Sequence, residues 1–210
     1  MTAVKICCIQ SVDEAEMASA AGASAIGLVA AMPSGPGPIP DARIAEIAGA
    51  LRGRIETVLL TAETGAEAIA EHVARTGPSA VQLVDPAAAA AIPALRALHP
   101  ALRIFQVVHV ADAGAVAEAR GTAADALLLD SGVPGAGELG GTGRTHDWAL
   151  SARIVAEAEV PVWLAGGLKP ENAAEAIWTV RPHGLDICSG LRPTGVLDAG
   201  RLAAFMVATK

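Results

Sequence analysis

Residues 161–190 read PVWLAGGLKPENAAEAIWTVRPHGLDICSG, and they contain two short apolar runs on either side of a longer helical one. Residues 161–165 and 184–188 have the length and composition of buried strands. Residues 170–180 are rich in alanine and open with Pro170, which is favoured in the first turn of a helix. Turn signals follow both strands, at residues 166–167 and 189–190. The stretch therefore predicts a strand, a helix and a second strand in succession.

The rest of the chain repeats this alternation. Strands are predicted at residues 4–9, 25–30, 56–61, 80–84, 103–110, 126–130, 161–165 and 184–188, and helices at about residues 13–21, 41–51, 66–75, 86–98, 113–120, 148–157, 170–180 and 198–208. An open Rossmann or flavodoxin-like sheet would need only about five or six strands. It would also have a glycine-rich first turn, whereas Gln10 and Ser11 follow the first strand here. We therefore predict the α/β class and a (β/α)8 TIM barrel, as a single domain over residues 1–210.

Composition excludes several classes of protein. The chain is 52% hydrophobic and 2% aromatic and has a formal net charge of −7. Abundant aliphatic residues exclude intrinsic disorder, and scattered Lys and Arg argue against a nucleic-acid partner. We expect no membrane span, because no apolar run reaches about 18 residues, and no signal-peptide pattern opens the chain. Three cysteines cannot form a disulfide framework in a chain this long, so we expect reduced thiols and a cytoplasmic location.

The first strand carries the first candidate for chemistry. Alternation places Lys5, Cys7 and Ile9 on one face and Cys8 on the other. A lysine is unfavourable against the covering helices, so the face with Lys5 should line the barrel lumen. Cys7 then lies inside, and an ammonium nearby would stabilise its thiolate, which makes it a candidate general base or nucleophile. The alternative is a small buried apolar side chain.

Asp130 ends the sixth strand where a glycine-rich loop, residues 131–145, begins. Its carboxyl could deliver a proton while Cys7 removes another across the lumen. Alternatively, Asp130 anchors its loop through backbone amides. Within the loop, residues 140–145 resemble an anion-cradling segment that contains Gly141. The segment lacks the Gly-Lys-Ser/Thr ending of a P-loop, so we do not expect nucleotide hydrolysis.

The loops after the seventh and eighth strands are candidates for binding phosphate. Gly166 and Gly167 follow one strand, and Ser189 and Gly190 follow the other. Barrels often hold a phosphate at these two positions, because glycine lets backbone amides approach an anion closely. Asp186 shares an inward face with this end and is a further candidate polar contact. Tight turns are the alternative interpretation.

The histidines indicate no metal site. Five are scattered without metal-ligand spacing, so no zinc or iron site is predicted. His72 and His99 fall on predicted helices and are expected at the surface. His146 and His109 lie nearer the loops and are further candidates for substrate binding.

Seven segments together resemble phosphoribosylanthranilate isomerases of tryptophan biosynthesis, in order and from end to end: residues 4–7 (VKIC), 22–27 (GASAIG), 81–83 (VQL), 128–130 (LLD), 140–148 (GGTGRTHDW), 164–172 (LAGGLKPEN) and 186–190 (DICSG). The resemblance implies an eightfold barrel and an Amadori rearrangement, which opens the ribose ring and turns an aldose into a ketose. It implies Cys7 as general base, Asp130 as general acid and phosphate binding by the seventh and eighth loops. Lys5, Gln82 and Gly141 match the family's motifs at the substrate site. No cofactor is implied, because the substrate's imine serves as the electron sink.

The chain departs from the family pattern mainly where the anthranilate ring would lie. Residues 32–40, MPSGPGPIP, replace a segment that usually supplies an arginine to the anthranilate carboxylate. Val84 stands where the family has His, and His146 where Phe is common. Cys8 replaces a usual Gly and Cys188 a usual Ser. Loss of one charge-assisted contact typically costs about 1.5–3 kcal/mol of binding free energy. The sequence therefore predicts the phosphate and proton-transfer groups but does not determine which amine the substrate carries.

Three functions follow in order of preference. The first is the isomerase itself, and the second is a paralogue that isomerises another phosphorylated aldose or ribosylamine. The third is a non-catalytic barrel that binds a sugar phosphate. In each case the expected partner is a small phosphorylated sugar, with no nucleic acid or membrane, and the chain acts as a monomer or homodimer.

Overall fold

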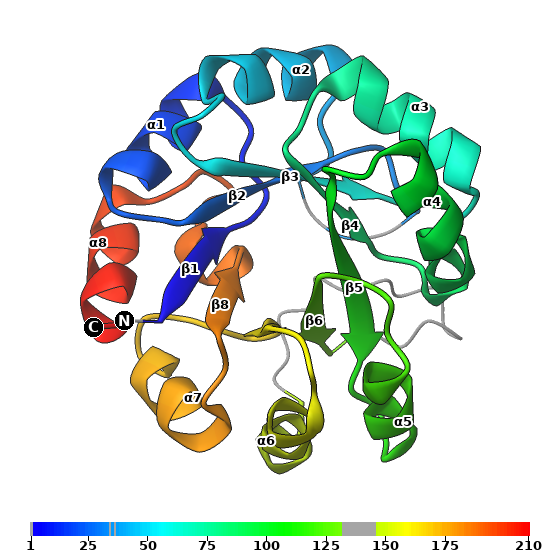
Figure 1. The fold of residues 1–210 in the computed structure, drawn as a ribbon. Helices are drawn as coiled ribbons and strands as arrows, with labels where there is room; N and C mark the ends of the chain where they lie inside the picture. The colour runs from blue at the N-terminus through cyan, green and yellow to red at the C-terminus, as the bar shows by residue number, and fades with distance from the viewer. Residues whose placement is uncertain (1, 34, 36, 132–145) are drawn as a thin grey trace.

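A computed structural model describes residues 2–33, 35, 37–131 and 146–210, and its eight parallel strands close into a barrel in the order β1 to β8. Figure 1 shows the helices arranged as a ring around the strands. The sheet closes between the first and last strands, where Ala3 lies opposite Gly184 and Ile6 opposite Ile187. The predicted α/β class and (β/α)8 barrel are confirmed.

The strands are β1 (Ala3–Ile6), β2 (Ala25–Val29), β3 (Glu56–Thr61), β4 (Ala80–Leu83), β5 (Arg103–His109), β6 (Ala126–Asp130), β7 (Val162–Leu164) and β8 (Gly184–Ile187). The α-helices are α1 (Val12–Ala20), α2 (Asp41–Ala50), α3 (Ala66–Thr76), α4 (Ile92–Leu98), α5 (Gly114–Arg120), α6 (Trp148–Glu157), α7 (Ala173–Val180) and α8 (Ala199–Ala208). Two 3-10 segments, η1 (Pro86–Ala91) and η3 (Ser189–Leu191), complete the described elements.

Two predicted helices differ from the observed ones at proline residues. The helix predicted over residues 86–98 is divided into η1 and α4. Pro93 has no amide hydrogen to donate to the carbonyl four residues earlier, which interrupts a continuous α-helix. The helix predicted from Pro170 begins instead at Ala173, with Asn172 as its N-cap residue. The Asn172 side chain accepts a hydrogen bond from the Lys169 amide at 2.9 Å, so the residues before α7 form a turn.

The alternation predicted for residues 4–9 fails after Cys7. β1 ends at Ile6, and Cys8 has a φ of 61°, a left-handed conformation that breaks the strand geometry. Cys7 and Cys8 consequently both belong to the apolar cluster inside the barrel, whereas Ile9 packs in the cluster that includes the helices. The predictions that Cys8 faces outward and that Ile9 faces the lumen are wrong.

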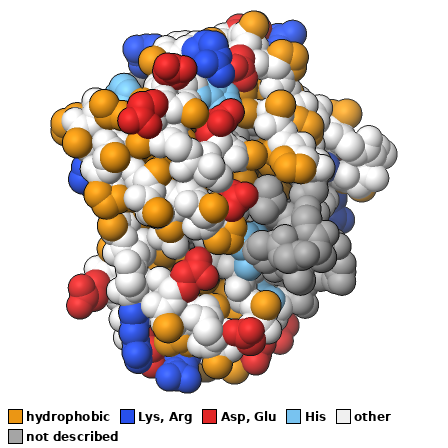
Figure 2. All heavy atoms as spheres, turned by 90° about the vertical axis from the view of Figure 1, so that its right-hand side faces the viewer, with side chains coloured by type: hydrophobic (Ala, Val, Ile, Leu, Met, Phe, Trp, Pro, Cys, Tyr) orange, Lys and Arg blue, Asp and Glu red, His pale blue; other side chains and the backbone are white. Residues whose placement is uncertain are grey.

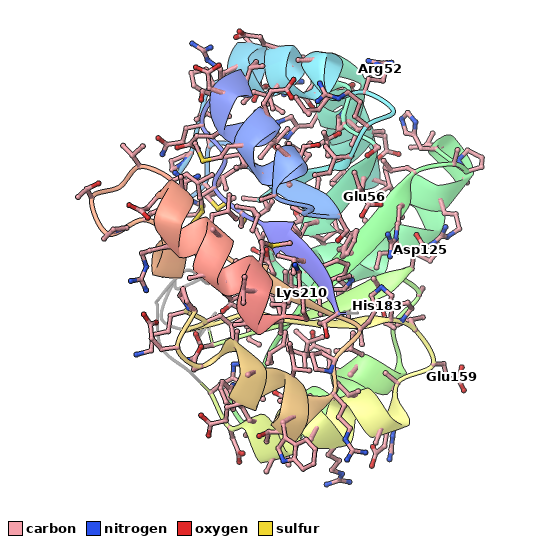
Figure 3. The ribbon with its side chains drawn as sticks, turned by 90° about the vertical axis from the view of Figure 1, so that its left-hand side faces the viewer. Arg52, Glu56, Asp125, Glu159, His183 and Lys210 are labelled. Atoms are coloured by element: carbon pink, nitrogen blue, oxygen red, sulfur yellow. A yellow bond between two sulfur atoms is a disulfide. The ribbon has the colours of Figure 1, made fainter. Side chains whose placement is uncertain are left out.

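Large side chains fill the lumen near the amino-terminal ends of the strands. Phe105 and Trp163 are buried there with ring centroids 6.0 Å apart, and the His183 ring lies 5.5 Å from that of Trp163. A Cβ atom at Gly184 would lie 2.6 Å from the Trp163 ring, so only glycine fits beside it. Figure 3 labels polar residues at this end, among them Glu56, which pairs with Arg103. The closed amino-terminal end leaves the opposite end for a site.

His72 is buried, which corrects the expectation that it lies at the surface. Its Nδ1 atom lies 3.0 Å from the Thr61 hydroxyl of β3, and its Nε2 atom lies 3.2 Å from the Asp41 carboxylate of α2. The imidazole therefore joins β3, α2 and α3 through polar contacts. Alternation of polar and apolar residues on α3 could not reveal these partners, because they come from other elements.

Two features of the described residues concern hydropathy and surface charge. No helix among the described residues is long and apolar enough to cross a membrane. On the face shown in Figure 2, acidic and basic side chains form small separate groups among neutral atoms. The described side chains of this face form no continuous basic surface.

Candidate active site

A pocket opens at the carboxyl-terminal ends of the strands and gathers most of the predicted site residues. Its wall includes Cys7, Gln82, Asp130, Gly166, Gly167, Asp186 and Ser189. Gly190 lines an adjoining hollow together with Gly167 and Ser189. Lys5 lies beneath the pocket and contacts Asp186, while Gly141 falls outside the described residues. Residues from five strands or the loops after them, far apart in sequence, thus meet at one site.

Lys5 and Asp186 form a buried ion pair under Cys7. They lie opposite each other in the β1–β8 register, and Lys5 Nζ donates to Asp186 Oδ1 at 3.0 Å. Burial disfavours the Lys5 ammonium, but Asp186 and Cys7 outweigh it, so the pKa of Lys5 lies above its ordinary value. Burial raises the pKa of Asp186, and Lys5 opposes that shift. The pair places a cation beside the thiol, as the alternation of the first strand predicted.

The Cys7 thiol itself holds its proton more tightly than an ordinary cysteine. Burial raises its pKa to about 11, although the Lys5 ammonium acts in the opposite direction. Lys5 therefore favours the thiolate, as expected from the sequence, but burial disfavours it more strongly. Cys7 is nearly enclosed by protein, and the charged form loses more hydration than one ammonium supplies.

Asp130 reaches the pocket from the end of β6, across the lumen from Cys7. Its Oδ1 atom accepts a hydrogen bond from the Ser131 amide at 2.7 Å. The carboxyl thus makes the loop contact considered as the alternative to catalysis, and it also faces the pocket. His109 lies beside it in the β5–β6 register, and the charge of Asp130 acts on His146. Burial lowers the pKa of His146, whose Nε2 atom lies 2.7 Å from the Ser151 hydroxyl.

The loops after β7 and β8 touch each other at the rim of the pocket. Gly166 and Gly167 have φ angles of 82° and 65°, which favour glycine. A Cβ atom at Gly190 would lie 2.1 Å from the carbonyl oxygen of Leu168, so the loops can meet only if residue 190 is glycine. Small residues with accessible backbone at a loop junction suit an anion.

Two cations near these loops were not anticipated from the sequence. Arg201 Nε donates to the Gly190 carbonyl at 2.7 Å, and its other end pairs with Glu171. Lys169 and Arg201 line the hollow outside the Gly167 and Ser189 backbone. The sequence carries no signal for Arg201, because it lies in the first turn of α8 and reaches the loop only after the barrel has closed.

The opposite half of the pocket is apolar. The described residues on this side are Val29, Met32, Leu60, Val84, Val107 and Leu128, and none of the described lining residues is Lys or Arg. Arg43, the one arginine that follows the second strand closely, pairs with Glu46 on the surface of α2. Gln82 lies in the same pocket, and its buried Oε1 atom has no hydrogen-bond partner among the described residues. This atom is available to a ligand.

Cys8 and Cys188 form a disulfide, which corrects the expectation of reduced thiols; Cys7 is free and buried. The left-handed backbone at Cys8 turns its side chain toward β8, a change of direction that strict alternation does not anticipate. Among the described residues, no group of three or more His, Cys, Asp or Glu side chains could hold a metal ion.

Comparison with known proteins agrees with this geometry. The model of the N-(5'-phosphoribosyl)anthranilate (PRA) isomerase family matches residues 4–208. The N-(5'-phosphoribosyl)anthranilate isomerase of Haloferax volcanii is 37% identical, with 100% of this chain and 94% of that protein covered. Isomerase 2 of Methanosarcina mazei is 36% identical, with 97% and 92% covered.

Solved structures show the same relationship. The phosphoribosylanthranilate isomerase of Thermococcus kodakaraensis superimposes with a TM-score of 0.83 at 29% identity, and 100% of this chain and 99% of that one are covered. Another, solved with reduced 1-(o-carboxyphenylamino)-1-deoxyribulose 5-phosphate, has a TM-score of 0.79 at 26% identity, with 100% and 98% covered. Sequence, fold and site geometry thus agree, and the chain belongs to the N-(5'-phosphoribosyl)anthranilate isomerase family.

Proposed function

We propose that this protein isomerises N-(5'-phosphoribosyl)anthranilate to 1-(o-carboxyphenylamino)-1-deoxyribulose 5-phosphate in tryptophan biosynthesis. The observation that carries the proposal is the placement of a thiol and a carboxyl, Cys7 and Asp130, across one pocket whose rim is formed by two glycine-containing loops. One group must give a proton to the ribose ring oxygen, and the other must remove a proton from carbon 2. A phosphoribosylanthranilate isomerase similar to this chain was solved in complex with reduced 1-(o-carboxyphenylamino)-1-deoxyribulose 5-phosphate.

In the proposed mechanism Asp130 donates a proton to the ring oxygen as the ring C–O bond breaks. The amine nitrogen supplies the electron pair and becomes the imine nitrogen of a Schiff base. Cys7 as thiolate then takes the carbon 2 proton, and the C–H electrons move toward the imine to give an enolamine. Tautomerisation to the ketone completes an internal oxidation and reduction. The substrate carries its own electron sink, so no cofactor enters the steps.

Lys5 makes the thiolate of Cys7 attainable. A buried thiolate without a neighbouring cation would be strongly disfavoured. The Lys5 ammonium, held by Asp186, offsets part of that cost when the proton leaves Cys7. Lys5 and Asp186 are therefore proposed as positioning and electrostatic residues rather than as groups that transfer protons to the substrate.

The phosphate is proposed to bind at the junction of the loops after β7 and β8. Backbone amides near Gly166, Gly167, Ser189 and Gly190 would donate to its oxygens. The charges of Lys169 and Arg201, on the outer side of the same loops, support a dianion there. Gln82 would bind a ribose hydroxyl through its unpartnered Oε1 atom.

A second candidate is an isomerase for a ribosylamine with a different amine. The apolar wall around Val84 favours it, because no described side chain there neutralises an anthranilate carboxylate. Comparing kcat/KM for the anthranilate adduct with that for the aniline adduct, which lacks only the carboxylate, separates the two. A preference for the aniline adduct supports the second candidate.

The test of the proposed function uses a tryptophan auxotroph that lacks its isomerase. We expect rescue by the wild-type chain and none by Cys7→Ser or Asp130→Asn. With purified protein, NMR should show aldose-to-ketose conversion in wild type and a loss of kcat of at least about 100-fold in either variant, with the dissociation constant of a product analogue little changed. Near-wild-type turnover in either variant would overturn the mechanism. We further infer one 210-residue domain that works in the cytoplasm as a monomer or homodimer; a Thermotoga maritima relative is described as dimeric.

A further inference from the structure

The Cys8–Cys188 disulfide lies in the wall of the pocket, yet the proposed isomerisation does not use it. The two residues are 180 positions apart in the sequence, and their Cα atoms are 5.8 Å apart. Cys8 follows β1 directly after the proposed base, Cys7. Cys188 follows β8 and directly precedes Ser189, the first residue of the proposed phosphate loop. One covalent bond therefore connects the base to the phosphate site.

A third loop lies against this bond. A Cβ atom at Gly37, in the loop after β2, would lie 2.7 Å from Cys8 Cβ and 3.2 Å from Cys8 Sγ. Gly37 thus packs directly on Cys8, and the loops after β1, β2 and β8 meet at the disulfide. Reduction of this disulfide would therefore alter the packing of all three loops around the mouth of the pocket.

The left-handed backbone at Cys8 is a second sign that the cysteine side chain has a function there. Its φ of 61° belongs to the left-handed region, which residues with a Cβ atom adopt rarely and at a cost. A glycine would meet the same backbone geometry without that cost. The thiol at this position, with a second cysteine within bonding reach across the barrel seam, provides a link that glycine cannot.

We propose that Cys8 and Cys188 form a redox modification site for low-molecular-weight thiols, whose state sets the affinity of the adjoining loop for phosphate. The proposal rests on the phosphate site of the proposed function. In the oxidised state the disulfide holds Ser189 and Gly190 in a fixed place relative to Cys7. In the reduced state the loop still contacts Leu168 and Arg201, but it loses its covalent link to the loop after β1 and samples more conformations. Preorganisation of the oxidised loop lowers the entropic cost of binding an anion.

The exchange reaction balances with two thiol molecules. A thiolate RS⁻ attacks the sulfur of Cys188, because Cys188 is more exposed than Cys8. Cys8 leaves as a thiolate and takes up a proton. A second RS⁻ attacks the sulfur of the bound RS group, which releases RSSR, and Cys188 then takes up a proton. Two RSH molecules are oxidised to one RSSR, and the protein disulfide gains two electrons and two protons.

The neighbouring Cys7 does not compete in this exchange. Burial keeps it protonated near neutral pH, and the thiol form does not attack a disulfide. A free thiol and a disulfide can therefore persist side by side in the same pocket. Disulfides of intracellular proteins are usually transient and redox-sensing, which is the behaviour proposed here.

The test measures inorganic phosphate binding by calorimetry in full-length protein purified without reductant, before and after treatment with reduced glutathione. Alkylation with iodoacetamide in denaturant, followed by mass spectrometry, counts the free thiols in each sample. We expect one free thiol before treatment and three after it, with phosphate affinity about three- to tenfold weaker in the reduced protein. Oxidised glutathione should restore both values.

Two variants serve as matched controls. Cys8→Gly and Cys188→Ser should each bind phosphate with an affinity that glutathione does not change. Equal affinity in the two redox states of the wild type, or three free thiols even after oxidised glutathione, would overturn the proposal. Absence of phosphate binding in every state would contradict the phosphate site, and with it the effect proposed here. A changed thiol count with unchanged affinity would contradict only the present proposal.

Discussion

Two opposing effects act on the pKa of Cys7, and their balance determines whether the proposed base is a thiol or a thiolate before substrate binds. The thiol is buried, which favours the neutral form, and it adjoins the Lys5 ammonium, which favours the thiolate. Burial prevails, so the free protein holds a thiol rather than a preformed thiolate. Reactivity at Cys7 should therefore depend on pH over a range well above neutrality.

The rate at which iodoacetamide alkylates Cys7 in the native protein should rise with pH with a midpoint near 11. Only the thiolate is alkylated, so a raised pKa moves the reactive form to higher pH. The rate is best measured in the Cys8→Gly/Cys188→Ser double variant, where Cys7 is the only cysteine. An unstructured cysteine peptide, with an ordinary pKa of about 8.5, provides the reference.

Replacing Lys5 by Met in the same background should slow alkylation further at every pH below the midpoint, because the thiolate then loses its neighbouring cation. A midpoint below that of the peptide would show that Lys5 outweighs burial. In that case the thiolate would be present in the free protein, and the base would need no activation.

The loops after β7 and β8 act as one element because their backbones touch. Gly190 allows the contact with the Leu168 carbonyl, and Arg201 holds the Gly190 carbonyl from the outside. The phosphate site is thus a property of the junction rather than of either loop. Displacing one loop should weaken phosphate binding more than it disturbs Cys7 or Asp130.

Gly190→Ala tests this interdependence. The added Cβ atom would lie 2.1 Å from a backbone oxygen, so the two loops must separate. We expect KM for the phosphorylated substrate to rise by about tenfold or more, with a smaller change in kcat, because the loss is mainly in ground-state binding. Gly49→Ala is the matched control: nothing lies within 4 Å of its Cβ, and it should leave KM unchanged. Equal effects of the two substitutions would refute the role given to the junction.

The sequence predicted the strands and helices more completely than it predicted the contacts within the site. Alternating strand and helix patterns predicted all eight units, because hydrophobic periodicity is local. Cys7, Asp130 and the loop glycines could be placed at one end, because parallel strands bring their carboxyl ends together. The Cys8–Cys188 bond could not be predicted, since it depends on one φ angle after β1. The burial of Cys7 and the reach of Arg201 depend on packing between distant elements.

The whole barrel is closed where its first and last units meet, and besides the backbone pairing of β1 with β8, three links that involve described side chains cross this seam. Lys5 pairs with Asp186 beneath the pocket, and Cys8 bonds to Cys188 at its wall. Outside the strands, the Glu14 carboxylate of α1 accepts hydrogen bonds from both Arg192 terminal nitrogens, at 2.9 and 2.7 Å, and from the Leu197 amide at 3.1 Å. These links compensate for the entropic cost of joining segments about 180 residues apart.

Arg192→Met should lower the free energy of unfolding by about 3 kcal/mol at pH 7, because it leaves the buried Glu14 carboxylate without its cation. Burial alone would raise the pKa of Glu14, but bonds from Arg192 and two backbone amides hold it below its ordinary value. Stability from a lowered carboxyl pKa is present above the unfolded-state pKa and is lost as pH falls through the folded-state pKa. The difference between wild type and variant in the free energy of urea unfolding should therefore shrink as pH falls below about 4.3.

Arg43→Met is the control, because it breaks only the exposed pair with Glu46. It should change the free energy of unfolding by less than about 0.5 kcal/mol at both pH 7 and pH 3.5. A loss in Arg192→Met that is equally large at pH 7 and pH 3.5 would mean that packing of the arginine side chain, rather than its charge, holds the seam.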